Sequence, residues 1–219
     1  MSIGMGEPPR ALPRGPHGLS RDEVERSQHA RLLAAMADAV AEKGYAHTSV
    51  ADVLLRAGVS RATFYAQFRD KEDCFLAAST ASVEALTAAL ARVLERDADD
   101  PDVTPLDRLD RMLGLYLDVL HVAPAFARTF LVEVYAAGPR AIELRRESIE
   151  RFVDLVAESH RGETGLLGSE PHQRFAAEAL IGAVSSMVTN LVGVGDYDAL
   201  PALREPLMHL ARTLAASGG

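Results

Sequence analysis

Apolar side chains recur at intervals of three and four residues along most of the chain, which is the spacing of an amphipathic helix. The first clear stripe consists of Leu33, Met36, Ala37 and Val40. Gly44 is placed to end that helix, because glycine readily takes the left-handed conformation of a helix cap. No segment alternates between apolar and polar residues as a half-buried strand does. The pattern therefore predicts an all-α fold of about nine helices.

Capping residues and Pro or Gly breaks give the limits of the individual helices. Ser49 with Asp52, and Asp70 with Asp73, have the spacing of a capping box, and Ser60 can cap a helix on its own. The predicted helices span residues 21–43, 50–57, 60–68, 71–97, 104–121, 124–136, 139–161, 170–193 and 199–216.

The same pattern divides the chain into three parts. Residues 1–20 are rich in Pro and Gly without periodicity, so we expect a flexible N-terminal arm. Residues 21–70 should form a three-helix head, and residues 71–219 a larger helical body. Within the head, a short helix, a turn at Gly58 and a second short helix have the proportions of a helix-turn-helix unit.

The second helix of this unit carries residue types suited to DNA. Its exposed face is predicted to present Arg61, Thr63, Tyr65 and Gln67. Arg can pair with guanine and Gln with adenine, whereas Tyr is better placed to donate to a phosphate. Spacing alone leaves the alternative open that these residues form the solvated face of a small helical bundle.

A cation in the first turn of a helix opposes the helix dipole, and Lys71 occupies such a position. A bound anion would reverse that effect. We therefore expect a phosphate to bind between the Lys71 ammonium and the free backbone amides near Asp70 to Asp73. Thr48 and Ser49 offer a second phosphate site of the same kind, at the start of the preceding short helix.

Charge and composition narrow the partners and the compartment. The net charge of -8 is uneven, since residues 1–71 hold ten Lys and Arg against eight Asp and Glu, and the acidic excess lies in the body. A hydrophobic share of 48% indicates a globular core. No apolar stretch is long enough to span a membrane, and residues 1–20 contain no apolar run of the kind that a secretory signal has. Cys74 is the one thiol, so we expect no disulfide and no metal cluster. We therefore expect a cytoplasmic protein without a metal or cofactor.

One segment of the sequence weakly resembles a catalytic motif. Gly58-Val59-Ser60-Arg61-Ala62 approximates the nucleophile elbow of hydrolases, but a helix precedes it and the final Gly is absent. Phosphate loops, dinucleotide fingerprints and metal-ligand spacings are missing as well. We therefore expect no enzyme. A helical protein-binding adaptor without DNA recognition is the alternative, against which the presence of Arg61, Tyr65 and Lys71 together weighs.

The run from Arg31 to Ala78 resembles the N-terminal DNA-binding region of the tetracycline-repressor (TetR) family. The matching positions include Gly44-Tyr45, Thr48-Ser49-Val50, Ala57-Gly58-Val59-Ser60, Thr63-Phe64-Tyr65, Phe68 and Lys71-Glu72, in the family's order without gaps. Val40, where Phe is frequent, and Ala62, where Gly is frequent, depart from the pattern. The resemblance implies DNA contacts at Ser49, Ser60, Arg61, Ala62, Thr63, Tyr65, Gln67 and Lys71.

For the whole chain, the resemblance implies a homodimer that binds a palindromic double-stranded operator. It further implies a small-molecule effector bound by the body, and most commonly repression that the effector relieves. Candidate ligand residues in the body are Tyr116, His121, Arg128, Phe130, Tyr135, Phe152 and Met187.

Two leucine-rich stripes on the last two helices are candidates for the dimer interface. Their members are Leu180, Val184, Met187 and Leu191 on one helix, and Leu203, Leu207, Leu210 and Leu214 on the other. Two such helices from each subunit would form a four-helix bundle. The alternative is that the stripes only close the core of the monomer.

Overall fold

The computed structural model describes residues 20–97, 100, 102–158 and 170–217, so the predicted arm lies outside it except for Ser20. Within these residues the chain is helical throughout, with nine α-helices and two short 3₁₀ helices and no strand. The α-helices are α1 (Arg21–Lys43), α2 (Val50–Ala57), α3 (Arg61–Gln67), α4 (Lys71–Asp97), α5 (Pro105–Val122), α6 (Pro124–Leu131), α7 (Pro139–Glu158), α8 (Glu170–Val194) and α9 (Arg204–Ser217). The predicted all-α fold is confirmed.

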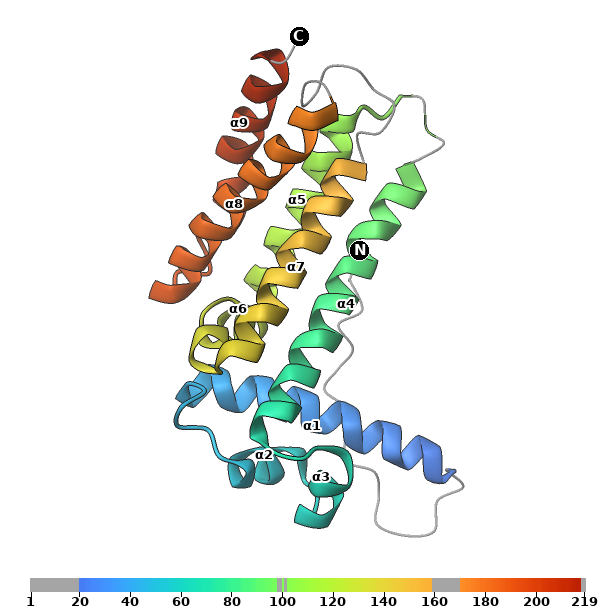
Figure 1. The fold of residues 1–219 in the computed structure, drawn as a ribbon, viewed down its shortest axis with the longest axis vertical. Coiled ribbons are helices and arrows are strands. Elements are labelled where there is room, and N and C mark those ends of the chain that lie inside the picture. Colours follow the sequence, from blue (N-terminus) through green and yellow to red (C-terminus); the bar gives the residue numbers. More distant parts are fainter. Residues whose placement is uncertain (1–19, 98–99, 101, 159–169, 218–219) are drawn as a thin grey trace.

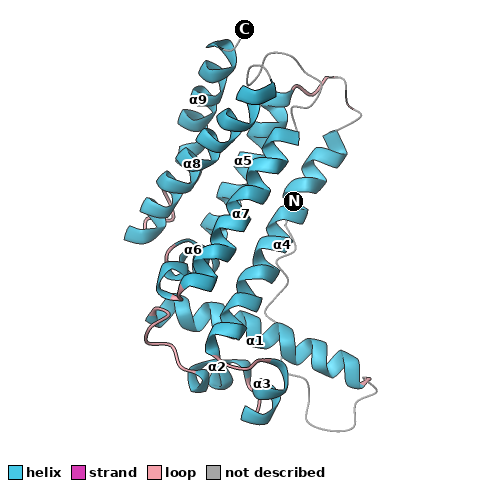
Figure 2. Cartoon of the chain, viewed as in Figure 1, coloured by secondary structure: helices cyan, strands magenta, loops and turns pink. Residues whose placement is uncertain are grey.

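The helices form a small head and a longer body (Figures 1 and 2). Helices α1, α2 and α3 gather at one end, and α4 leads from α3 along the body beside α7. Helix α6 packs against α1, as α4 does, so two helices join the body to the head. Helices α8 and α9 lie side by side along one edge of the body.

The capping signals at Ser49 and Ser60 form the bonds that they predict, whereas the predicted box of Asp70 and Asp73 forms only the bond from the Asp73 amide to Asp70. Ser49 and Asp52 make a reciprocal capping box at the start of α2, and Gly58 ends that helix with a left-handed φ of 61°. Ser60 caps α3 by accepting a hydrogen bond from the Thr63 amide. These local bonds set the length of the turn between α2 and α3, and therefore the angle at which the two helices meet.

Two predicted helices are interrupted, and a third is described only in part. The predicted helix 124–136 divides into α6 and a 3₁₀ turn, η1 (Glu133–Ala136), where Glu133 and Val134 face the head. The predicted helix 199–216 begins as a 3₁₀ turn, η2 (Pro201–Leu203), as helix N-termini frequently do. Residues 159–161 of the predicted helix 139–161 lie outside the described residues.

Two clusters of buried side chains stabilise the fold. The body cluster draws on α4 to α9. The head cluster joins α1 to α3 with the first turns of α4, and it also takes in Phe130, Val134, Ala137 and Ala141. The division of the chain between residues 70 and 71 stays a prediction, since the head core includes side chains from beyond it.

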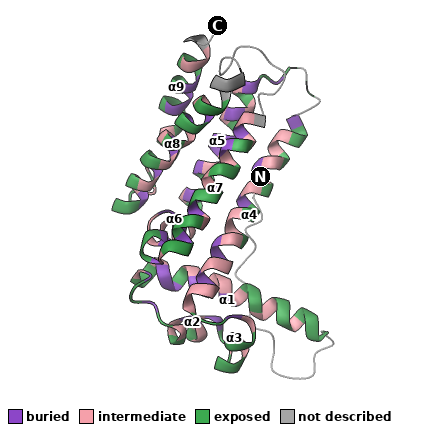
Figure 3. Ribbon diagram, viewed as in Figure 1, coloured by how far each residue is buried: buried purple, intermediate pink, exposed green. Residues whose placement is uncertain are grey.

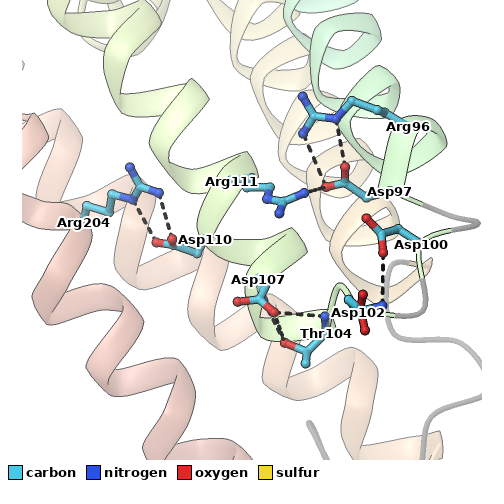
Figure 4. A network of polar contacts seen from close by, with 9 residues as sticks. All are labelled: Arg96, Asp97, Asp100, Asp102, Thr104, Asp107, Asp110, Arg111 and Arg204. Carbon is cyan, nitrogen blue, oxygen red and sulfur yellow. Dashed lines mark hydrogen bonds and ion pairs between the residues drawn. The ribbon is translucent and has the colours of Figure 1, made fainter.

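A network of ion pairs and caps ties α4, α5 and α9 together at the end of the body away from the head (Figure 4). The buried Asp97 carboxylate lies 2.8 Å from Arg96 and 2.7 Å from Arg111 of α5. Next to Arg111 on α5, both oxygens of Asp110 accept bonds of 2.8 Å from Arg204 of α9. The network fixes the relative position of three long helices.

Two helices, α4 and residues 174–194 of α8, are long and apolar enough to cross a membrane by length and composition alone. Both pack against other helices of the bundle, and core helices of soluble proteins also pass that test. The cytoplasmic location therefore stays a prediction. In the described part of the chain, no group of three or more His, Cys, Asp or Glu side chains is arranged to hold a metal ion.

Candidate nucleic-acid interface and ligand cavity

Helix α3 lies against the head through its aromatic side chains. Phe64 is fully buried, and its ring contacts those of Tyr65 and Phe68 at 5.3 and 5.5 Å between centroids. Helix α2 is held to α1 by ion pairs of Lys43 with Asp52 and of Arg56 with Glu42. The head therefore presents α3 as a rigid element, with one side anchored and the other exposed.

The exposed side of α3 consists of Arg61, Ala62, Tyr65 and Ala66, next to the cap residue Ser60. The Arg61 guanidinium lies 5.9 Å from the centre of the Tyr65 ring. Among the described residues Arg61 forms no ion pair, so its charge is free to meet an anion. Figure 3 shows this helix and the first half of α1 as the most exposed part of the head.

Two side chains predicted to face outward are half-buried instead. Gln67 hydrogen-bonds to His29 of α1 over 2.9 Å, and the His29 ring stacks on Phe68. The Thr63 hydroxyl lies 2.9 Å from that of Ser60 within the helix cap. Because α3 has only seven residues, its contact with α1 takes up the last turn, and the first turn carries the exposed Arg61 and Ala62.

At the predicted phosphate site of Thr48 and Ser49, only one of the two hydroxyls is accessible. Thr48 is buried and donates to the carbonyl oxygens of Gly44 and Ala39, so its hydroxyl is not available to a phosphate. Ser49 is exposed at the N-terminus of α2, where its hydroxyl also donates to Asp52 over 2.7 Å. Of this pair, only Ser49 remains a candidate contact.

Lys71 is half-buried beneath the turn that follows α1. Its ammonium donates to the Tyr45 carbonyl over 2.8 Å and lies 4.1 Å from the centre of the Tyr45 ring, and burial lowers its pKa. Asp70 accepts from the Asp73 amide in the first turn of α4, and Asp73 accepts from the Arg69 amide just before the helix. The predicted phosphate contact of Lys71 would have to use the two ammonium protons that Tyr45 leaves free.

The segment that resembled a hydrolase elbow has a different geometry. Ser60 follows helix α2 and a left-handed glycine, and no strand precedes it in the described residues. Its hydroxyl accepts from the Thr63 amide as a helix cap. The arrangement is that of a helix-turn-helix.

The body contains two neighbouring cavities, of about 60 Å³ and about 30 Å³. Tyr116, Arg145 and Phe152 line both of them, so these three side chains form the wall between the two cavities. The larger one extends toward α8 and α9 and is otherwise apolar except for Ser185. The smaller one reaches Phe126, Phe130 and Val134 of α6 and η1.

Three of the seven predicted ligand residues line these cavities: Tyr116, Phe130 and Phe152. The other four lie elsewhere. His121 hydrogen-bonds to the Tyr197 carbonyl, Arg128 pairs with Glu133, and both Tyr135 and Met187 are exposed. The sequence pattern does not distinguish these positions, because each depends on how its own helix, α5, α6, η1 or α8, is rotated in the bundle.

Sequence reasoning missed the one charged residue of the cavities, Arg145. A signal for it was present, because Arg145 stands in line with Ala141, Ser148 and Phe152 on the inner face of α7. Its neighbour Arg146 is exposed and pairs with Glu143 and Glu150. Burial raises the pKa of Tyr116, and the positive charge of Arg145 acts on it in the opposite direction.

The head and the body meet at the turn around Tyr45. Glu133 of η1 accepts a hydrogen bond of 2.9 Å from the Tyr45 amide and also pairs with Arg128. Thr129 of α6 is buried and donates to the Ala37 carbonyl of α1 over 2.9 Å. The helix that borders the smaller cavity is therefore also bonded directly to α1.

The predicted dimer stripes divide between the core and the surface. Leu180, Val184 and Leu207 are buried in the core of the monomer, as the alternative in the sequence analysis had it. Met187 and Leu210 are exposed, whereas Leu191, Leu203 and Leu214 are half-buried. The exposed face of α8 also carries the small residues Ala179, Gly182 and Ser186.

Comparison with known proteins supports the resemblance at the level of sequence. Residues 32–78 match the model of the bacterial regulatory proteins of the tetR family. The transcriptional regulator AcuR of Cereibacter sphaeroides is 34% identical over 103 residues, which are 47% of this chain and 42% of AcuR. The chain thus matches less than half of the length of that relative.

Solved structures match most of the chain. A transcriptional regulator from Rhodococcus sp. Rha1 superposes with a TM-score of 0.69 at 23% identity, covering 87% of this chain and 96% of that one. FadR from Bacillus subtilis, solved in complex with stearoyl-CoA, gives a TM-score of 0.66 at 19% identity, covering 84% and 97%. The resemblance to the TetR family is confirmed, and the described helices have the fold of TetR-family regulators.

Proposed function

We propose that this chain, whose residues 32–78 are of TetR-family type, is a ligand-responsive transcriptional regulator that binds DNA through α3. The observation that carries the proposal is the free Arg61 charge beside Tyr65 on the exposed first turn of a short, firmly anchored helix. A helix presented in this way fits the major groove with its N-terminal residues at the base edges. Arg61 would read a base, while Tyr65 and Ser49 would position the head on phosphates.

The ligand would act through α6. A molecule that enlarges the smaller cavity pushes against Phe126, Phe130 and Val134. Thr129 and Glu133, on the same segment, hold α1 and the Tyr45 turn, so movement of α6 carries the head with it. A ligand that favours one head position thereby lowers operator affinity without touching DNA, as repression relieved by an effector requires.

A second copy of the chain would pack on α8 and α9. The exposed Met187 and Leu210 supply apolar surface, and the small residues on α8 allow close approach of another helix. Two copies related by a two-fold axis would place two α3 helices on half-sites about 34 Å apart, one turn of B-DNA. The operator is then expected to be palindromic.

The test is selection of bound duplexes from a random pool with the purified protein, beside Arg61→Ala and Arg92→Ala variants. Arg92 is an exposed cation on α4, so its substitution makes the same charge change away from α3. We expect a palindrome for the wild type and for Arg92→Ala, and none for Arg61→Ala. Failure of the ligand-stripped protein to enrich any sequence would contradict the proposal and favour a protein-binding adaptor.

A further inference from the structure

The guanidinium of Arg145 is a buried cation with no anionic partner. Its side chain is 8% exposed, and it lines both cavities of the body. One nitrogen, Nη2, donates to the Ser185 hydroxyl over 2.8 Å, while Nε has no hydrogen-bond partner among the described residues. No carboxylate of the described residues lies within ion-pair distance of it. Buried polar groups are almost always paired, so this arrangement requires an explanation.

The surroundings of Arg145 do not supply the missing charge. Across the cavities it faces Tyr116 of α5, Phe152 of its own helix and Ser185 of α8, all of them neutral. The acidic groups nearest to it on its own helix, Glu143, Glu147 and Glu150, are all exposed, and Glu143 and Glu150 pair with Arg146. On α5, Asp110 is bound to Arg204. Removal of a cation from water without a partner destabilises a fold, which suggests that the partner arrives with a ligand.

The shape of the site indicates the rest of that ligand. From Arg145 the larger cavity continues between leucine, valine, isoleucine and methionine side chains of α5, α7, α8 and α9. An anionic head at Arg145 would therefore be followed by an aliphatic tail. One guanidinium with a free Nε edge matches the two oxygens of one carboxylate, and a single cation balances a single negative charge.

We propose that Arg145 is the recognition residue for an aliphatic monocarboxylate, which binds with its carboxylate on the guanidinium and its chain in the larger cavity. The Ser185 hydroxyl, which accepts from Arg145, has its own proton to donate to the same carboxylate, and Tyr116 lines both cavities beside Arg145. The proposal rests on the proposed function for its regulatory meaning, and it names the chemical class of the effector. Binding at Arg145 would also alter the wall shared with the smaller cavity, which borders α6.

The experiment measures binding of hexanoate, octanoate and their primary amides by calorimetry, without DNA. The full chain is compared with Arg145→Gln, Arg145→Lys and the control Arg146→Gln, which removes the exposed, acid-paired neighbour on the same helix. We expect the acids to bind more tightly than the amides by at least about tenfold. Arg145→Gln should lose about 10- to 100-fold in acid affinity, Arg145→Lys less, and Arg146→Gln nothing.

Three outcomes would overturn the inference: no acid binds, acid and amide bind equally, or Arg145→Gln binds the acid as the wild type does. Tighter binding of octyl phosphate than of octanoate would also contradict a monocarboxylate site. Because no DNA is present, failure here is distinct from failure to select an operator.

Thermal melting of the ligand-free protein separates recognition from a structural role. Arg145→Met removes an unpaired buried charge and keeps an apolar side chain of similar reach, so its melting temperature should equal or exceed that of the wild type. A clear decrease would show that Arg145 stabilises the fold and would contradict the proposal. Circular dichroism of each variant confirms that its helices are intact.

Discussion

The backbone at Tyr45 is held from both sides by charged side chains. Glu133 accepts from its amide, and the Lys71 ammonium donates to its carbonyl. These bonds come from two different segments, one on η1 and the other at the start of α4. The position of this one turn therefore depends on both η1 and the start of α4.

Cys74 illustrates how burial fixes the chemistry of one residue. Its side chain is fully buried, and burial together with the charge of Asp73 raises the pKa of the thiol to about 12. The thiolate is the reactive form, so the folded protein should react with iodoacetamide at pH 8 at least about 100-fold more slowly than the urea-unfolded chain. Equal rates in the two states would contradict the buried position.

Single residues were predicted unevenly from the sequence. Caps such as Ser49 and Ser60 depend on neighbours within three positions, and the structure forms them as expected. Asp70 also caps α4, but Asp73 accepts from the Arg69 amide in place of the reciprocal bond of a capping box. Gln67 and Arg145 depend on contacts with distant helices, His29 of α1 and Ser185 of α8. Sequence spacing gives the face of a helix only to within a turn, so it did not reveal these contacts.

At the scale of elements, α4, α5 and α9 are joined by carboxylates whose pKa values are lowered. The bond from Arg96, supported by Arg111, lowers the pKa of Asp97, and the bonds from Arg204 lower that of Asp110. These carboxylates stabilise the fold in their charged form. Their contribution is complete above the unfolded pKa of about 3.9 and is lost as the pH falls through the lower folded values.

Substitution of Asp97 should therefore weaken the junction of α4 with α5. For Asp97→Asn we expect a loss of about 1 to 3 kcal/mol in the free energy of unfolding at pH 7, because Arg96 and Arg111 lose charged acceptors. The loss should shrink as the pH falls below about 3.9 and through the lower pKa of folded Asp97. Urea unfolding at pH 7 and at a series of lower pH values measures it, with the exposed Asp118→Asn as control. A loss that stays constant over the series would contradict an ionic origin.

The exposed face of α8 allows a direct test of dimerisation. At Gly182 an added side chain meets nothing within 4 Å in the monomer, and replacing a mid-helix glycine favours the helix. Gly182→Arg should therefore fold normally and yet shift the protein from dimer to monomer in sedimentation velocity. The control is Ala88→Arg on the exposed face of α4. A dimer unchanged by Gly182→Arg would exclude this face as the interface.

At the scale of the whole molecule, the sequence predicted the number and order of the helices, because most of them are long and have clear capping residues. The limits of α1, α2 and α4 agree with the sequence pattern. The breaks at η1 and η2 were not predicted, and neither was the sharing of core between head and body. Phe130, Val134 and Ala141 belong to the head cluster although they are distant in sequence from α1 to α3. Contacts between distant segments cannot be read from the spacing of apolar residues within one helix.

This shared core predicts how the protein unfolds. Separation of the head from α6 and α7 would expose Phe130, Val134 and Ala141 and break the bonds of Thr129 and Glu133. Calorimetry should therefore show one cooperative transition, in which the calorimetric and van't Hoff enthalpies agree. Two resolved transitions would mean that the head melts independently, and the proposed coupling through α6 would lose its basis.

The most direct measurement of the central claim is hydroxyl-radical footprinting of the protein on its selected duplex. If two α3 helices enter successive major grooves, two protected segments should appear on one face of the DNA with their centres about one helical turn apart. The Arg61→Ala variant should leave both unprotected at the same concentration. Protection that is continuous, lies on no single face, or persists in Arg61→Ala would contradict DNA recognition by α3.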